Sequence, residues 1–188
     1  STYTTAATGT AFPFTDVAES RWSYPYIKEL YDAGVVSGTS ATTFSPAANV
    51  TRAQFVTMLA GLAGADVSNC PATPFRDVPE GAWYAPYVNW ALANGIVSGT
   101  SAVTFSPDAS ITRQDMAVML YSYTQRFQVH LQQQPVKPFT DAGSIAAYAQ
   151  IAVQTLQRAG VISGMPDGSF QPYGTATREQ ACTMLCML

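Results

Sequence analysis

Three arginines stand directly after a threonine, at matching places in a sequence that repeats itself three times. The pairs are Thr51-Arg52, Thr112-Arg113 and Thr177-Arg178, and successive arginines are 61 and 65 residues apart. Threonine is a favoured N-cap residue, so each arginine is expected at the first position of a helix. A helix N-terminus carries unpaired N–H groups and partial positive charge, and a guanidinium beside it favours a carboxylate or phosphate ligand. The pattern therefore predicts an anion site in each repeat.

Each repeat also contains one aspartate at a constant place, which gives the arginines a competing partner. The segments are Phe14-Thr15-Asp16, Phe75-Arg76-Asp77 and Phe139-Thr140-Asp141. An alternative to ligand binding is an internal ion pair between each arginine and the aspartate of its own or a neighbouring repeat. The two interpretations are compatible if the aspartate orients the arginine.

Two further repeated features suit a sugar ligand. The aromatic residues in register are Trp22, Trp83 and Tyr148. An exposed ring is a good platform for the face of a sugar, although ordinary core packing explains such residues equally well. The Ser-Gly pairs are Ser37-Gly38, Ser98-Gly99 and Ser163-Gly164. Their small side chains would let a ligand approach the backbone, and turn formation alone is the alternative.

The composition argues against several other classes of function. The chain has a formal net charge of −3 and no basic run that would follow phosphates, so we expect no nucleic acid partner. No apolar run approaches the length of a membrane span, so we expect no membrane insertion. With a single histidine, His130, and no nucleophile motif, we expect no catalytic residues, no metal site and no cofactor. Cys70, Cys182 and Cys186 are interpreted as structural thiols, with a bridge from Cys70 to either of the others as the alternative.

Two helices per repeat would position these residues. The first is predicted over 22–33, 83–94 and 148–159, with Pro25 and Pro86 in the first turn and a glycine C-terminal cap at 34, 95 and 160. The second begins after Thr51, Thr112 and Thr177, and Thr-x-x-Gln predicts capping boxes in repeats one and three. Between the helices, the phenylalanine of a Phe-x-Pro segment is expected to fill the core of each repeat.

The predicted organisation is all-α, with tandem helix-loop-helix repeats. The repeats cover 12–63, 75–124 and 139–188, separated by linkers at 64–74 and 125–138 and preceded by a flexible lead-in at 1–11. Because a helix pair of this size cannot bury its apolar face alone, we expect the three repeats to pack together around a pseudo-threefold axis.

The combined motif resembles the S-layer homology repeat. The order is Phe-x-Asp-Val, Trp, Ala-x-Gly-Ile/Val-Val-Ser-Gly, Phe-Ser-Pro and Thr-Arg-Ala-Gln, and three copies cover about residues 12–188. The resemblance implies a three-pronged helical spindle. It also implies a secreted module of the bacterial surface that binds secondary cell wall polysaccharide, often through a pyruvylated amino sugar. Such a module can belong to a larger surface protein.

In the family, the Thr-Arg arginine meets the acidic sugar in grooves between neighbouring repeats. Carried over, this role falls on Arg52, Arg113 and Arg178, with Trp22, Trp83 and Tyr148 as groove walls. Repeat three has Tyr where the others have Trp, and repeat two has Asp115 where repeats one and three have Gln54 and Gln180. We therefore expect the grooves that use Trp22 or Trp83 to bind best. The alternative function is a protein-interaction or assembly module of a surface layer, with internal Arg–Asp ion pairs.

Overall fold

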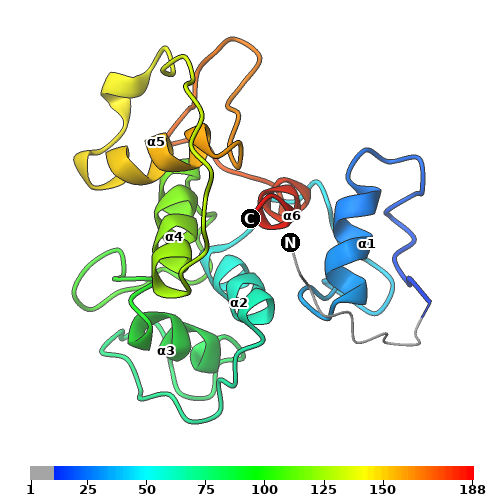
Figure 1. Cartoon of the computed structure of the whole chain (residues 1–188). Helices are drawn as coiled ribbons and strands as arrows, with labels where there is room; N and C mark the ends of the chain where they lie inside the picture. Colours follow the sequence, from blue (N-terminus) through cyan, green and yellow to red (C-terminus); the bar gives the residue numbers. More distant parts are fainter. Residues whose placement is uncertain (1–10) are drawn as a thin grey trace.

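The computed structural model describes residues 11–188, and within them the chain is helical without any strand (Figure 1). The predicted flexible lead-in lies almost entirely outside the described residues. Six α-helices and two short 3-10 helices follow one another in the order α1 Tyr24–Asp32, α2 Arg52–Ala63, α3 Ala85–Ala93, α4 Arg113–Arg126, η1 Ala142–Ser144, η2 Ala147–Ala149, α5 Gln150–Arg158 and α6 Arg178–Cys186. The all-α fold class predicted from the sequence is confirmed.

The first helix of each repeat is shorter than predicted, but it carries the expected glycine after its C-terminus. Helices α1 and α3 carry proline at their first turn, and each begins two residues later than the sequence pattern suggested. Each first helix is followed by a glycine in the left-handed conformation, with φ of 74° at Gly34, 70° at Gly95 and 75° at Gly160. These backbone angles are costly for any other residue, which explains why a glycine stops the helix there.

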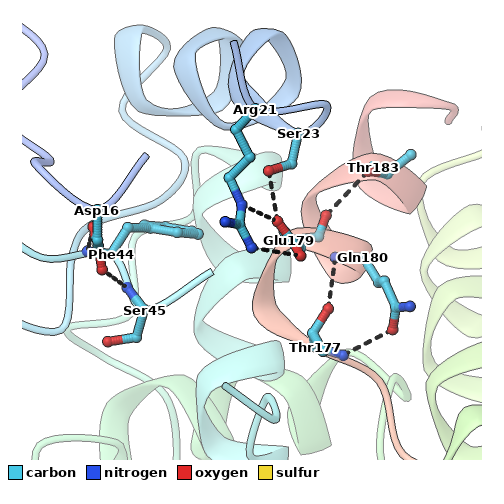
Figure 2. Close-up of polar contacts among 9 residues, drawn as sticks. All are labelled: Asp16, Arg21, Ser23, Phe44, Ser45, Thr177, Glu179, Gln180 and Thr183. Atoms are coloured by element: carbon cyan, nitrogen blue, oxygen red, sulfur yellow. Dashed lines mark hydrogen bonds and ion pairs between the residues drawn. The ribbon is translucent and has the colours of Figure 1, made fainter. Parts of the chain in front are cut away.

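The second helix of each repeat begins at the predicted arginine. Thr51 and Thr177 form complete capping boxes, because each threonine hydroxyl accepts from the backbone N–H of the glutamine three residues on and that glutamine accepts from the threonine N–H. Figure 2 shows this exchange between Thr177 and Gln180. In repeat two the Thr112 hydroxyl accepts from the Asp115 N–H, but the return bond is not formed. The aspartate is one methylene shorter than glutamine and its carboxylate is directed elsewhere.

Helices pair between repeats. Helix α2 of repeat one packs on α3 of repeat two, α4 of repeat two packs on α5 of repeat three, and α6 of repeat three returns to pack on α1 of repeat one. Figure 1 shows these three neighbouring pairs, with the red C-terminal helix α6 beside the blue α1. Because each pair joins two repeats, no repeat buries its helices with its own residues alone.

Short extended segments that precede the second helices join the repeats at their backbones. Isolated bridges connect Asn49 with Thr177, Thr51 with Ser110, and Thr112 with Thr175. The side chains between these positions, Val50, Ile111 and Ala176, are fully buried. Each repeat therefore contacts the other two in a fixed cyclic order. The pseudo-threefold symmetry of the whole and the exact repeat and linker boundaries stay predictions.

The phenylalanines of the Phe-x-Pro segments fill the core as predicted. Phe44, Phe105 and Phe170 have exposed fractions of 0%, 0% and 1%. Their rings meet those of Phe14, Phe75 and Phe139, with centroids 5.2 to 5.8 Å apart. Burial of two aromatic rings per repeat gives each small unit a substantial share of the apolar core.

Candidate functional site: grooves between the repeats

The arginine of each Thr-Arg pair is buried and is anchored by the neighbouring repeat. The Nε–H of Arg52 donates to the carbonyl of Phe105 at 2.8 Å, that of Arg113 to Phe170 at 2.7 Å, and that of Arg178 to Phe44 at 2.8 Å. Each guanidinium also lies over the ring of the same phenylalanine, at 4.6 to 5.0 Å from its centroid. The exposed fractions of the three arginines are only 4% to 6%. One edge and one face of each guanidinium are thus fixed by protein. A terminal nitrogen of Arg52 also donates to Asp115, and one of Arg178 donates to the carbonyl of Ser37.

The helix N-termini do not supply the free N–H groups that the sequence suggested. The backbone N–H of Arg113 donates to the carbonyl of Gly174 and that of Gln114 to Pro172, and the equivalent amides of the other two helices also donate to a neighbouring repeat. The third amide of each helix bonds to its threonine cap. The prediction of unpaired helix-terminal amides is therefore wrong, because inter-repeat contacts use them. Any anion must be held by the guanidinium and nearby side chains.

The repeated aspartates do not form ion pairs with these arginines. Both carboxylate oxygens of Asp16 accept backbone N–H groups, from Phe44 at 2.9 Å and Ser45 at 2.8 Å (Figure 2). Asp77 binds the same two amides of repeat two, and Asp141 those of repeat three. The alternative of a direct pair is wrong within residues 11–188. The aspartates support the arginines indirectly. They fix the backbone of the phenylalanine whose carbonyl accepts the hydrogen bond from the arginine.

These bonds favour the charged form of the Asp16 carboxylate. Partial burial opposes ionisation of Asp16, but the amides of Phe44 and Ser45 outweigh it and lower the pKa of this carboxyl. Burial lowers the pKa of the Arg113 guanidinium, and the charge of Asp141 partly offsets that effect. Arginine nevertheless stays protonated at any physiological pH, so a buried positive charge persists in each repeat.

The aromatic residues in register are exposed, which contradicts the core-packing alternative. Trp22, Trp83 and Tyr148 have exposed fractions of 55%, 58% and 64%. Rings of this size are usually among the more buried side chains of a domain. Three such rings at equivalent positions therefore form a repeated surface feature.

The segment that carries Trp22 is held by a cluster that sequence reasoning missed. Figure 2 shows Arg21 and Ser23 reaching Glu179 of helix α6 from the two sides of Trp22 in the chain. Arg21 donates to Glu179 at 2.7 and 3.1 Å, and the Ser23 hydroxyl donates at 2.7 Å. The Arg21 hydrogen bond lowers the pKa of Glu179, against the opposing effect of burial, and the Ser23 bond adds to it. Glu179 directly follows the site arginine Arg178, and this position was the sequence signal that could have identified it.

Three grooves bring the predicted residues together, and every groove draws on all three repeats. The Arg113 groove has a volume of about 230 Å³ and is lined by Trp22, Ser163, Gly164 and Gln180 among others. The Arg178 groove, of about 400 Å³, is lined by Trp83, Ser37, Gly38 and Gln54. The Arg52 groove, of about 370 Å³, is lined by Tyr148, Ser98, Gly99 and Asp115. The latter two volumes lie in the range of small-molecule sites, and the Arg113 groove falls somewhat below it.

The Ser-Gly turns have a packing reason as well as a place in the grooves. A side chain at Gly38 would lie 2.4 Å from the ring of Phe14, and one at Gly99 would lie 2.6 Å from that of Phe75. Gly99 also has a φ of 90°. Glycine is therefore required by the fold here, and the turn interpretation is sufficient to explain it.

Residues 11–188 contain no cluster of histidine, cysteine and acidic residues that is able to hold a metal ion. None of the helices described is long and apolar enough to cross a membrane. Cys70, Cys182 and Cys186 are free thiols, as the simpler interpretation predicted, and burial raises the pKa of Cys182 to about 12.

Comparison with known proteins agrees with this repeated architecture. The family model of the S-layer homology domain matches the chain at residues 13–56, 74–117 and 138–182. The chain belongs to the S-layer homology domain family. These matches confirm the three tandem repeats predicted from the sequence. The arginine-centred grooves are thus features of an S-layer homology triplet.

Relatives of this S-layer homology triplet include enzymes and surface proteins. It is 40% identical over 181 residues to an endoglucanase of Bacillus sp. (strain KSM-635), covering 95% of this chain and 19% of the relative. A cellulosome-anchoring protein of Acetivibrio thermocellus is 29% identical over 81% of this chain and 35% of its own length. The S-layer protein sap of Bacillus anthracis is 27% identical over 96% of this chain and 21% of its own length. The chain thus spans between about a fifth and a third of these relatives.

The family and its surface relatives indicate a secreted, cell-surface location and an anchoring role.

Proposed function

We propose that this triplet is a non-catalytic module that anchors a protein to the bacterial wall by binding an acidic polysaccharide in its inter-repeat grooves. The ligand class is a glycan with a pyruvylated amino sugar, as the family resemblance implies. The observation that carries the proposal is the Arg113 groove, where a buried guanidinium, an exposed tryptophan and a glutamine amide line one concave site.

Arg113 would receive the carboxylate of the ligand. Its Nε is bonded to the Phe170 carbonyl, and neither terminal nitrogen has a protein partner among the described residues. No buried side-chain nitrogen or oxygen of residues 11–188 lacks a hydrogen bond, so both terminal nitrogens keep some exposure, and Arg113 lines the groove. Two parallel donors on a rigid plane fit a carboxylate in bidentate geometry. Because the guanidinium is already fixed, binding costs little side-chain entropy.

Gln180 and Trp22 would contact the rest of the sugar. The Oε1 atom of Gln180 accepts from the Thr177 N–H at 3.0 Å, which orients the side chain and leaves its Nε2 donors for a ligand. The exposed Trp22 ring offers an apolar face and one N–H donor. The cluster of Arg21, Ser23 and Glu179 fixes the segment that carries this ring.

The Arg178 groove repeats this set with one difference. Gln54 accepts from the Thr51 N–H as Gln180 does, and Trp83 supplies the exposed ring. One N–H of the Arg178 Nη2 donates to the carbonyl of Ser37 at 3.1 Å, so this guanidinium has one donor fewer for a ligand than that of Arg113. We therefore expect the Arg178 groove to bind acidic glycan more weakly than the Arg113 groove.

The non-catalytic part of the proposal is supported by the use of the repeated acids. Asp16, Asp77 and Asp141 each use both carboxylate oxygens to bind backbone amides. An acid–base pair for glycoside hydrolysis needs two carboxyl groups that face one bond of the substrate. These groups instead serve the loops that hold the arginines.

An assembly module of a surface layer remains the second candidate. The observation that favours it is the internal ion pair between Arg52 and Asp115, at 3.0 Å, which satisfies one site arginine without a ligand. If this pattern described all three sites, the arginines would serve stability alone. Arg113 and Arg178 have no such pair within the described chain, which favours glycan binding there.

The test compares binding to purified wall polysaccharide before and after mild acid removal of its pyruvate. We expect wild type to bind only the pyruvylated polymer. The Arg113→Ala, Arg178→Ala double variant should lose roughly thirtyfold or more in affinity, the loss expected when a desolvated charge pair loses one partner. Arg76→Ala is the matched control, since Arg76 is exposed and lies outside the grooves. Unchanged binding by the double variant, with its fold intact by circular dichroism, would reject the proposal.

A further inference from the structure

We infer that Asp115 is a specificity-determining residue that closes the Arg52 groove to acidic ligands, so that only two of the three grooves take the charged sugar. The inference rests on the proposed function and identifies which grooves perform it. It is carried by contacts of Asp115 that have no counterpart in the other two repeats.

The third residue of each second helix decides what faces the site arginine. In repeats one and three it is glutamine, whose Oε1 turns back to the threonine N–H of its own helix at 3.0 Å. In repeat two it is Asp115, whose shorter side chain leaves that bond unmade. Its Oδ2 instead accepts from the Nη1 of Arg52 at 3.0 Å. A carboxylate of the protein thus occupies the side of the guanidinium where a ligand carboxylate would bind.

Tyr148 completes this contact from a third repeat. Its hydroxyl donates to the Oδ1 of Asp115 at 2.6 Å, so both carboxylate oxygens are engaged. The other grooves have tryptophan at this place, and tryptophan has no hydroxyl to offer. Two departures from the repeat pattern, Tyr for Trp and Asp for Gln, lie 33 residues apart in sequence and meet in one groove. Desolvation and the hydrogen bond to Asp115 raise the pKa of Tyr148 to about 12.

An acidic sugar would meet two obstacles in this groove. Arg52 donates its Nε–H to Phe105 and one N–H of Nη1 to Asp115, so fewer of its donors are left for a ligand than in Arg113. The ligand carboxylate would also stand beside the negative charge of Asp115 on the same guanidinium. Like charges at such short range on one guanidinium disfavour the complex. In the Arg178 groove the guanidinium donates to the neutral carbonyl of Ser37 instead, so a ligand carboxylate meets no comparable repulsion there.

Counting occupied grooves tests the inference. Wild type and Asp115→Gln are titrated calorimetrically with pyruvylated wall oligosaccharide, and thermal unfolding checks that both are folded. We expect two bound ligands per chain for wild type and three for Asp115→Gln, because glutamine restores the capping box and removes the competing charge. The Asp115→Gln, Tyr148→Trp double variant reproduces the side chains of the other grooves and should also bind three. Asp108→Asn, an exposed position with the same change of charge, should stay at two.

The outcomes separate this inference from the function on which it rests. Three ligands on wild type, or two on both Asp115→Gln and the double variant, would overturn the role of Asp115 while leaving glycan binding in place. Binding by neither wild type nor the variants would reject the proposed function, and the inference with it. A rise from two to three that appears only when Asp115 is replaced would support both.

Discussion

Arg113 of repeat two is held by Phe170 of repeat three through both its edge and its face. The Nε donates to the Phe170 carbonyl at 2.7 Å, and the guanidinium carbon lies 5.0 Å from the centre of the ring. The same pair of contacts joins repeat three to one and repeat one to two. The same arginine therefore lines the groove and joins two repeats, so groove geometry and folding depend on each other.

Removal of Asp141 should weaken both the fold and the Arg113 groove. Its carboxylate holds the Phe170 and Gln171 amides, each at 2.8 Å, and so sets the carbonyl that receives Arg113. Loss of two charge-assisted hydrogen bonds in Asp141→Ala should lower the free energy of unfolding by about 3 kcal/mol. Urea denaturation measures this loss, and glycan titration of the folded fraction should show weaker binding. Asp108→Ala, at an exposed position, is the control, and equal stability of the two variants would contradict the assignment.

Replacing an exposed tryptophan should reduce glycan affinity, whereas replacing a buried tryptophan should reduce stability. Trp22→Ala and Trp83→Ala remove exposed rings, so stability should hardly change while affinity for the glycan falls about three- to tenfold, the scale of one aromatic contact. Trp90→Ala removes a ring that is only 5% exposed and should cost about 3–5 kcal/mol of stability. Paired melting and binding curves on the three variants check this. A groove role for Trp22 or Trp83 fails if its removal leaves affinity unchanged.

Acid should destabilise the closure between repeats three and one. The folded-state pKa of Glu179 is lowered from 4.5, so its contribution is complete above that value and disappears as the pH falls through the lower folded value. We expect the midpoint of thermal unfolding to drop on acidification from about pH 6 to about pH 3, with a smaller drop in Glu179→Gln. Glu80→Gln, at an exposed position, should keep the wild-type profile. Identical profiles for wild type and Glu179→Gln would show that this carboxylate carries none of the acid sensitivity.

Local signals in the sequence predicted the elements well. The threonine caps, the glycine stops and the buried phenylalanines depend on a few neighbouring residues, and each was found where its motif placed it. For Trp22, Trp83 and Tyr148 the residues alone left two interpretations open, an exposed sugar platform and core packing, because a repeated aromatic fits a core as well as a surface. The structure shows them exposed.

The specific residue contacts between repeats could not be predicted from the sequence. Helix α6 of repeat three packs on α1 of repeat one, and the amides of helix N-termini bond to loops of a neighbouring repeat. Such partners are distant in the chain, and local residue patterns do not identify them. The pairing of Asp115 with Arg52 and Tyr148 is of the same kind: the substitutions were visible, but their meeting in one groove required three dimensions.

The central claim is that buried arginines in these grooves recognise a sugar carboxylate. The most direct measurement is calorimetric titration of the intact chain with synthetic pyruvylated N-acetylmannosamine, compared with the same sugar without pyruvate. The account predicts binding of the pyruvylated sugar alone, with Arg113→Ala removing the tighter site. Equal binding of both sugars, or binding of neither, would contradict recognition through the carboxylate.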